Sequence, residues 1–242
     1  MTAEVPILRT EKVTKRFDGF VALDGVDFTL AEGERVGLIG PNGSGKSTFV
    51  NAITGVFAID AGTVLFDGTD ITRLTAWQRA RLGLARSFQI PRPFRSQSVR
   101  ENIEVPLMFA VGRSNPDQIT AEAEAILAAV GLGALAKASP KNLTQVDLRK
   151  LELARALAAK PRVLIADESM AGLSDSEVDE VLEVLMKLNA EGISIVLIEH
   201  IMRTVVRFSE RLVVFVAGKK IADGDPREVM SHPEVERAYL GQ

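Results

Sequence analysis

The sequence predicts an α/β fold in which a mostly parallel sheet is combined with an antiparallel β subdomain and an inserted α-helical subdomain. The opening strands alternate between apolar and polar residues, as strands with one solvated face do. Three later runs, 163–166, 193–198 and 212–216, are continuously apolar. Such runs are typical of parallel strands buried on both faces. Helical patterns dominate the middle of the chain, roughly 99–159.

The expected elements follow one another in a simple order. Strands with apolar cores are expected over 7–17, 26–30, 34–39 and 62–66, before the three later runs. Helices with periodic apolar residues are expected over 46–53, 121–130, 147–159 and 176–190. Gly131 and Lys160-Pro161 are typical helix stops, and they follow the second and third of these helices.

Length and composition narrow the class of protein. The chain has 242 residues and shows no internal repeat. We therefore expect a single domain over 1–242, with its core formed by 1–88 and 160–242 and its helical subdomain by 89–159. The absence of cysteine excludes disulfides and thiolate metal sites, and a net charge of −3 argues against nucleic acid as the main partner. No apolar run reaches the roughly 18 residues of a membrane span, so a soluble, cytosolic chain is expected.

One nine-residue segment carries the strongest functional signal. It reads Gly-Pro-Asn-Gly-Ser-Gly-Lys-Ser-Thr and matches the phosphate-loop pattern G-x-x-x-x-G-K-[ST]. The expected strand before it and helix after it would aim backbone N–H groups and a helix N-terminus at a phosphate. We expect binding of a nucleoside triphosphate, with Lys46 on the β- and γ-phosphates and Ser47 on Mg²⁺. A plainer interpretation is a glycine-rich turn with an exposed lysine. The predicted nucleotide-binding residues in this segment are Gly40, Pro41, Asn42, Gly43, Ser44, Gly45, Lys46, Ser47 and Thr48.

Acidic and imidazole side chains follow two of the expected parallel strands. Asp167 and Glu168 end the run at 163–166, and His200 comes shortly after the run at 193–198. Catalytic groups gather at such strand ends, so Asp167 is expected to hold Mg²⁺ and Glu168 to take a proton from water. His200 would donate a hydrogen bond to the γ-phosphate. Each also has a structural alternative, a turn cap for Asp167 and a satisfied core histidine for His200, and His232 is expected to be structural.

A basic stretch surrounds the joint between the core and the helical middle. Gln89 lies at this joint, just before Ile90-Pro91, where it could respond to nucleotide. Between residues 73 and 100 there is no acidic residue. The stretch is either a solvated face or the surface for an acidic or phosphate-bearing partner. It contains Arg73, Arg79, Arg81, Arg86, Arg92, Arg95 and Arg100.

The order of these motifs along nearly the whole chain resembles the nucleotide-binding subunit of an ABC transporter. The resemblance implies the fold of a P-loop NTPase, ATP and Mg²⁺ as cofactors, and ATP hydrolysis. It implies that Phe17 stacks on adenine, that Gln89 lies near Mg²⁺ and the attacking water, and that Glu168 is the general base. His200 would be the switch-loop histidine. The helical subdomain would meet membrane subunits through a coupling helix, which gives the basic stretch a possible partner.

Two segments differ in sequence from the family pattern. Where the family has Leu-Ser-Gly-Gly-Gln before a helix, this chain has Leu143, Thr144, Gln145, Val146 and Asp147. The family signature acts on the nucleotide of the opposite subunit, so Val146 would add bulk, and Asp147 negative charge, near that γ-phosphate. In the D-loop, formed by Ala171, Gly172, Leu173 and Ser174, the serine stands where the family usually has Asp.

Within the family, the chain is most similar to importers of branched-chain and other hydrophobic amino acids. The features that carry this likeness are the helix after Asp147, the run Glu168-Ser-Met-Ala-Gly-Leu and the ending Ala238-Tyr-Leu-Gly241. It implies two transmembrane permease subunits, an external solute-binding protein and a second ATPase subunit, here in a heterodimer. The chain would lie peripherally at the cytoplasmic face of the cell membrane. Two alternatives are a soluble ABC ATPase of repair or the ribosome, and a regulatory module that does not hydrolyse nucleotide.

Overall fold

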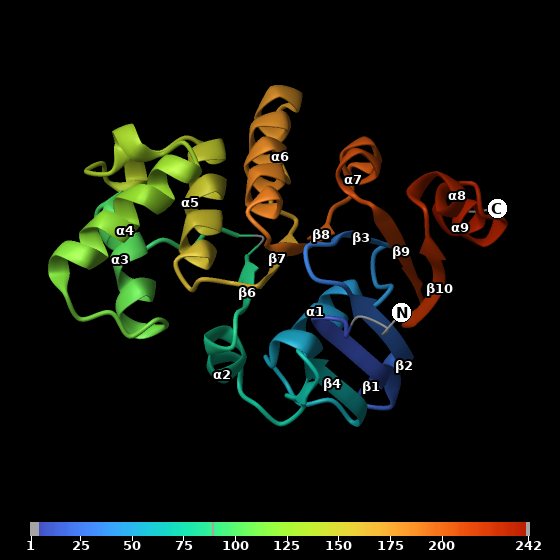
Figure 1. Cartoon of the computed structure of the whole chain (residues 1–242). Helices are drawn as coiled ribbons and strands as arrows, with labels where there is room; N and C mark the ends of the chain where they lie inside the picture. Colours follow the sequence, from blue (N-terminus) through green and yellow to red (C-terminus); the bar gives the residue numbers. More distant parts are fainter. Residues whose placement is uncertain (1–4, 89, 241–242) are drawn as a thin grey trace.

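The computed structural model describes residues 5–88 and 90–240, and within them the strands form two sheets (Figure 1). One is antiparallel, with strand order β2-β1-β4-β5. The other has the order β10-β9-β3-β8-β7-β6, in which all neighbours pair in parallel except β10 with β9. The predicted fold class is therefore confirmed: a mostly parallel sheet, an antiparallel sheet and a group of helices.

The expected strands and helices are all present, although β2 and α4 begin five or six residues earlier than expected, and the structure adds elements that have no expected range. The strands are β1 (Leu8–Phe17), β2 (Phe20–Leu30), β3 (Arg35–Ile39), β4 (Ala61–Phe66), β5 (Thr69–Asp70), β6 (Leu84–Ser87), β7 (Val163–Asp167), β8 (Ser194–Ile198), β9 (Arg211–Val216) and β10 (Lys219–Gly224). The α-helices are α1 (Lys46–Thr54), α2 (Ala76–Arg81), α3 (Val99–Phe109), α4 (Pro116–Ala129), α5 (Gln145–Leu157), α6 (Asp175–Ala190), α7 (Met202–Phe208), α8 (Pro226–Met230) and α9 (Pro233–Leu240). Short 3₁₀ turns lie at Gly133–Leu135 and Pro140–Asn142.

The parallel sheet separates two hydrophobic clusters. Along β7, Leu164 and Ala166 face the cluster that contains α5 and α6, whereas Val163 and Ile165 face the cluster of α1 and the antiparallel sheet. Every residue of β7 and β8 is buried. Both faces of these strands are therefore covered, which explains why their sequences are continuously apolar rather than alternating. Helix α1 packs between the two sheets, where Phe49 meets aromatic rings from β2 and β9 edge to face.

Helices α3, α4 and α5 form a group at one side of the molecule (Figure 1). Their starts follow ordinary capping rules: Ser98 and Glu101 form a capping box at α3, and Asn115 caps α4 before Pro116. Helix α5 also packs against β6 and α6, so it joins this group to the core. The assignment of 89–159 to a separate subdomain stays a prediction. In the described part of the chain, no helix has both the length and the apolar character needed to cross a membrane.

Candidate functional site

The phosphate loop connects β3 to α1 and leaves the start of α1 open. Gly45 caps the helix with a φ of 103°, no side chain caps it, and the first turn contains no acidic residue. A Cβ at Gly40 would lie 2.2 Å from the carbonyl oxygen of Phe215, and one at Gly45 would lie 2.7 Å from that of Ala22. Only glycine fits these two positions. The first N–H groups of α1 are therefore accessible at the N-terminal end of the helix. This end is positively polarised, which suits the binding of a phosphate.

Lys46 brings a cation into this loop. Its side chain is buried, and its Nζ donates hydrogen bonds to the carbonyl oxygens of Gly40 at 2.7 Å and Pro41 at 3.2 Å. Burial lowers the pKa of Lys46, while the charges of Glu168 and Asp167 act in the opposite direction. The next residue, Ser47, is exposed on the first turn of α1. The loop thus offers a lysine and a free hydroxyl group side by side.

The two predicted acids lie at the end of β7 in different environments. Asp167 is 5% exposed and its Oδ2 accepts a hydrogen bond from Arg86 at 2.5 Å. Glu168 has a φ of 47°, an uncommon backbone conformation for a residue with a side chain, and one that often occurs at functional sites. Asp167 and the Ser47 hydroxyl supply the hard oxygen ligands that Mg²⁺ prefers, and Mg²⁺ needs only a few from the protein. The donor set therefore fits a nucleotide-bound Mg²⁺.

The structure brings Glu168 and His200 together. The Nε2 atom of His200 lies 2.9 Å from Oε1 of Glu168, although the residues are 32 positions apart. The register of the sheet causes this, because β7 and β8 are parallel neighbours and Asp167 pairs with Ile198. The carboxylate is mostly covered and the imidazole half-exposed. A carboxylate held by a histidine at the edge of an open site is an arrangement that can accept a proton.

Glu199 matches none of the sequence motifs, yet it is an unusual group at this site because its carboxyl is buried. It is 2% exposed and accepts a hydrogen bond from the backbone N–H of Met170 at 2.8 Å. Burial raises its pKa to about 7, with Glu168 also raising it. Glu199 therefore ties the strand that precedes His200 to the segment after Glu168. Its position next to His200 at a strand end was the available signal.

Phe17 ends β1 and is 43% exposed, as a residue that stacks on a base must be. Its ring meets that of Phe57 edge to face, with centroids 5.5 Å apart. The ammonium of Lys15 lies 5.2 Å from the centroid of each ring. Phe57 and Lys15 therefore support Phe17 while leaving part of its ring accessible. Its role as the adenine platform stays a prediction.

The segment that replaces the family signature has a closed helix start. Thr144 caps α5, and its Oγ1 donates to Oδ2 of Asp147 at 2.7 Å while accepting the Asp147 N–H at 3.2 Å. The carboxylate of Asp147 thus turns back onto the cap. Val146 is 8% exposed and belongs to the core cluster of the helices. The bulk that the sequence suggested at this surface is therefore directed into the protein.

The D-loop segment runs beside this helix start. Arg149 of α5 donates to the carbonyl oxygen of Ala171 at 2.9 Å, and a Cβ on Gly172 would lie 3.7 Å from the Gln145 side chain. Leu173 packs against the core, and Ser174 caps α6 in a capping box with Glu177. Ser174 of the D-loop thus stabilises the start of the helix that follows it, α6.

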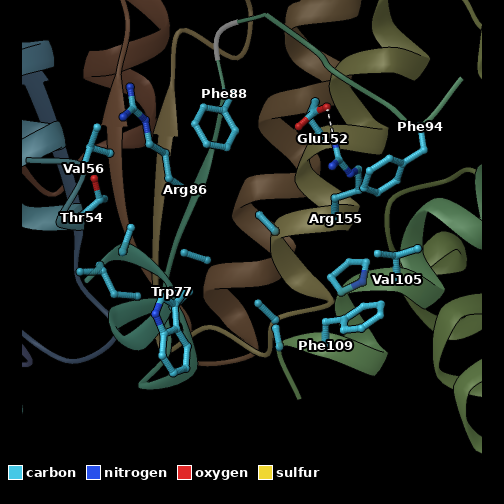
Figure 2. A pocket seen from close by; sticks show the side chains of 18 residues that line it. Thr54, Val56, Trp77, Arg86, Phe88, Phe94, Val105, Phe109, Glu152 and Arg155 are labelled. Carbon is cyan, nitrogen blue, oxygen red and sulfur yellow. Dashed lines mark hydrogen bonds and ion pairs between the residues drawn. The ribbon is translucent and has the colours of Figure 1, made fainter. Parts of the chain in front are cut away.

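An apolar groove of about 440 Å³ separates the core from the helical group (Figure 2). Phe88, Trp77 and Val56 line one side, and Phe94 and Phe109 line the other. All five side chains are well exposed. Glu152 stabilises the side of the groove that the helical group forms. Its Oε1 accepts hydrogen bonds from the guanidinium of Arg155 and from the backbone N–H of Arg92. The predicted Gln89 lies outside the described residues.

The arginines of the basic stretch have unequal environments. Arg79 is 2% exposed and donates to backbone carbonyls, including those of Ala52 and Ile53. Arg86 binds Asp167 and Arg100 pairs with Glu104, so these two are also engaged within the chain. Four others are exposed, namely Arg73, Arg81, Arg92 and Arg95. The stretch is therefore only in part a solvent-facing basic surface.

Comparison with known proteins gives relatives over the full length of the chain. The model of the ABC transporter family matches residues 23–171, and that of the branched-chain amino acid ATP-binding cassette transporter matches residues 219–242. The high-affinity branched-chain amino acid transport ATP-binding proteins BraF of Pseudomonas aeruginosa and LivG of Escherichia coli are each 36% identical to this chain. Each alignment covers 98% of this chain and 98% of the relative.

Solved structures agree in fold. A nucleotide-free ATP-binding cassette from an ABC transporter superposes with a TM-score of 0.88 at 30% identity, covering 98% of this chain and 100% of the other. The ADP conformation of an ATP-binding cassette gives the same values. A dimeric ATP-binding cassette bound to ADP and phosphate gives a TM-score of 0.82 at 26% identity, covering 91% and 99%. With its phosphate loop, strand-end acids and mixed sheets in the same order, the chain belongs to the ABC transporter family of ATP-binding ATPases.

Proposed function

We propose that this protein hydrolyses ATP to drive the uptake of branched-chain or other hydrophobic amino acids through partner membrane subunits. One observation carries the hydrolytic part: Glu168 and His200 are 2.9 Å apart at the sheet edge that also carries the phosphate loop and Asp167. The substrate class rests on similarity to transport proteins of that specificity along 98% of the chain.

In the proposed reaction, the backbone of the loop Gly40–Thr48 binds the phosphates and Lys46 neutralises the β- and γ-phosphates, while adenine stacks on Phe17. Glu168 accepts a proton from a water molecule, whose oxygen attacks the γ-phosphorus. The bond between the γ-phosphorus and the β–γ bridging oxygen breaks, so that ADP and inorganic phosphate are released. His200 keeps the carboxylate in place and contacts the γ-phosphate. Mg²⁺, held by Ser47, Gln89 and Asp167, would neutralise charge that develops on the phosphate oxygens.

The groove is the proposed docking surface for a segment of the membrane subunits. Its walls carry exposed aromatic side chains such as Phe88 and Phe109, and exposed arginines lie in the segments beside it. Apolar centres with polar rims are typical of protein interfaces, in which aromatic and arginine side chains are enriched. The complete system would contain two permease subunits and a solute-binding protein on the other side of the membrane, and this chain would lie peripherally at the cytoplasmic face. We propose no nucleic-acid partner.

A second, different ATPase subunit is the proposed dimer partner. In a head-to-tail dimer the start of α5 faces the nucleotide of the opposite subunit. Here the Thr144 hydroxyl is bound to the carboxylate of Asp147, so a phosphate would meet a negative charge and an engaged hydroxyl group. A homodimer would carry two such sites. A partner with the family signature Leu-Ser-Gly-Gly-Gln would present an uncapped helix start to the γ-phosphate. The site built on Lys46 and Glu168 of this chain would then be complete.

Replacing Glu168 by glutamine tests the proposal, because glutamine has nearly the same shape but cannot accept the proton. We expect Glu168→Gln to bind ATP and to hydrolyse it at least about 100-fold more slowly. Lys46→Ala should lose affinity for ATP as well. Phosphate release and ATP binding are measured on the complex with the membrane subunits, with Glu183→Gln on the exposed side of α6 as the matched control. Turnover by Glu168→Gln at the wild-type rate would remove that residue from its role.

Uptake measurements test the substrate class separately. Cells that contain the full system should take up labelled leucine in a manner that stops with Glu168→Gln. Uptake of a charged amino acid in place of leucine would overturn the proposed specificity. The proposed role in ATP hydrolysis would still stand.

A further inference from the structure

We propose that Arg86 is a positioning residue: it orients the carboxylate of Asp167 toward Mg²⁺ and links that carboxylate to the apolar groove. This inference rests on the proposed function, because it takes Asp167 as the Mg²⁺-binding acid. No part of the phosphate-loop pattern or of the strand-end acids includes Arg86. Three features of its surroundings lead to this role.

The first feature is a bridge between two elements of the nucleotide site. The guanidinium of Arg86 donates to Oδ2 of Asp167 at 2.5 Å and to Oδ1 of Asn51 at 2.6 Å. Asn51 lies on α1, four residues after Ser47 and therefore on the same side of that helix. Arg86 thus fixes the end of β7 against the face of α1 that presents Ser47, and it leaves the other carboxylate oxygen of Asp167 for a ligand.

The second feature is the burial of this pair. The side chain of Arg86 is 14% exposed and that of Asp167 is 7% exposed. A carboxylate with so little solvent around it depends on its ionic partner, and the planar fork of arginine holds such a group in one orientation. A carboxylate at a metal site is oriented in this way by a hydrogen-bonded neighbour that does not touch the metal. Arg86 has the position and chemistry of such a neighbour.

The third feature is the contact with the groove. Arg86 and Phe88 both line it, and the guanidinium lies 5.4 Å from the centroid of the Phe88 ring (Figure 2). They are two residues apart in extended chain and so lie on the same side of it. The Nε atom of Arg86 is buried and has no hydrogen-bond partner among the described residues. A partner segment that presses on Phe88 would therefore act on a side chain that already holds Asp167.

Binding measurements without turnover test the first part of this role. A nonhydrolysable ATP analogue is titrated calorimetrically into the purified chain in EDTA and at a series of Mg²⁺ concentrations. We expect Arg86→Met to raise the Mg²⁺ concentration needed for half-maximal tightening by about 10- to 100-fold. Affinity in EDTA should stay within about twofold, because Arg86 has no place on the phosphates in this proposal. Arg86→Lys keeps the charge but loses the fork, and should recover only part of the effect.

Two further variants separate positioning from folding. Arg79→Lys alters another buried arginine that binds backbone carbonyls of α1, so it should lower thermal stability without changing the Mg²⁺ requirement. Asn51→Ala leaves the pair of Arg86 and Asp167 in place but removes its anchor on α1. It should raise the Mg²⁺ requirement in the same direction, and it carries the test if Arg86→Met does not fold. A wild-type Mg²⁺ requirement in a folded Arg86→Met or Asn51→Ala protein would overturn the proposal.

The link to the groove is tested in the assembled complex. Assembly with the membrane subunits should change the Mg²⁺ requirement of the wild-type chain, and this change should be lost in Arg86→Met. An equal change in both would overturn the link. Asp167→Asn distinguishes the two levels of failure: if Asp167→Asn leaves the Mg²⁺ requirement unchanged, the proposed metal site is wrong. If Asp167→Asn alters it and Arg86→Met does not, only the role of Arg86 is wrong.

Discussion

Helix α1 begins near the strand-end acids Asp167 and Glu168, and helix α5 begins beside the D-loop residues that follow them, but the chemistry of their first turns is opposite. Helix α1 starts from Gly45, with no side-chain cap and no acidic residue. Helix α5 starts from Thr144 in a capping box: the Thr144 hydroxyl accepts the Asp147 N–H, and the carboxylate of Asp147 accepts the Thr144 N–H. The two helix dipoles are alike, so the difference comes from what fills the helix end. The start of α1 is open to an anion from outside the chain, whereas the start of α5 already carries the carboxylate of Asp147.

This comparison shows why a helix N-terminus alone does not make a phosphate site. A capping box stabilises a helix because it satisfies N–H groups that would otherwise lack partners. The same groups are needed to bind a phosphate. A chain can therefore use a helix start for stability or for binding, and we propose that this protein uses α5 for the former and α1 for the latter.

The largest effect is expected in the dimer with the second ATPase. If the closed start of α5 leaves one of two sites impaired, Glu168→Gln should lower ATPase activity by at least about 100-fold, the scale expected when a general base is lost. The equivalent substitution in the partner should cost much less. Steady-state phosphate release by each mixture decides the matter. Asp147→Gln keeps a capping box at the start of α5 but removes its negative charge, and should make the two losses more equal. Equal losses without this change would contradict the asymmetric arrangement.

The next effect concerns the segment that lies between the two helix starts. Glu199 holds it through the Met170 N–H, and the folded-state pKa of Glu199 is raised from 4.5 to about 7. The native protein therefore binds more protons than the unfolded chain between these values, so stability falls as pH rises through this range. The contribution is on the order of 3 kcal/mol, present below about pH 4.5 and lost above about pH 7. Urea denaturation at several pH values measures it.

Glu199→Gln is the control for this pH dependence, because the amide oxygen can still accept the Met170 N–H but does not titrate. The difference in unfolding free energy between wild type and Glu199→Gln should change across the range by the amount given above. A difference that stays constant from pH 4.5 to 7 would mean that Glu199 is not responsible.

The smallest effect is the stabilisation supplied by the closed helix start itself. Thr144→Ala removes the cap of α5 and should lower the free energy of unfolding by about 1 kcal/mol. Affinity of the isolated chain for ATP should not change, because the proposed phosphate site of this chain is at α1. Thr144→Ser keeps the hydroxyl group and should retain most of the stability. Weaker ATP binding by Thr144→Ala in the isolated chain would show that the division between the two helices is incomplete.

Much of the fold could be predicted because local patterns and burial agreed. Strands β7 and β8 are buried on both faces and their sequences are continuously apolar, so the parallel sheet was evident. Helix α2 was missed, although Thr75 and Gln78 form a capping box of the ordinary spacing. Its six residues are too few to show a period.

The site was predictable where its residues are contiguous, as in the phosphate loop. The contact of Arg86 with Asp167 joins positions 81 residues apart, and sequence alone does not give the pairing of β6 with β7 that brings them together. The burial of Glu199 likewise depends on the segment that covers it. The sequence pattern identifies Asp147 but not the direction in which its carboxylate points. A threonine followed three residues later by an acid is a capping signal, and a carboxylate held in the cap is less available to contact a phosphate.

The wall of the groove also carries the only tryptophan of the chain. Trp77 is 60% exposed and lines the core side of the groove together with Phe88 and Val56. Its fluorescence spectrum therefore reports on one location, with no second indole to confuse the signal. Transfer of this ring from water to an apolar contact should shift its emission to shorter wavelength. Docking of a tryptophan-free peptide from a membrane subunit could thus be followed optically, in real time and without attaching a label.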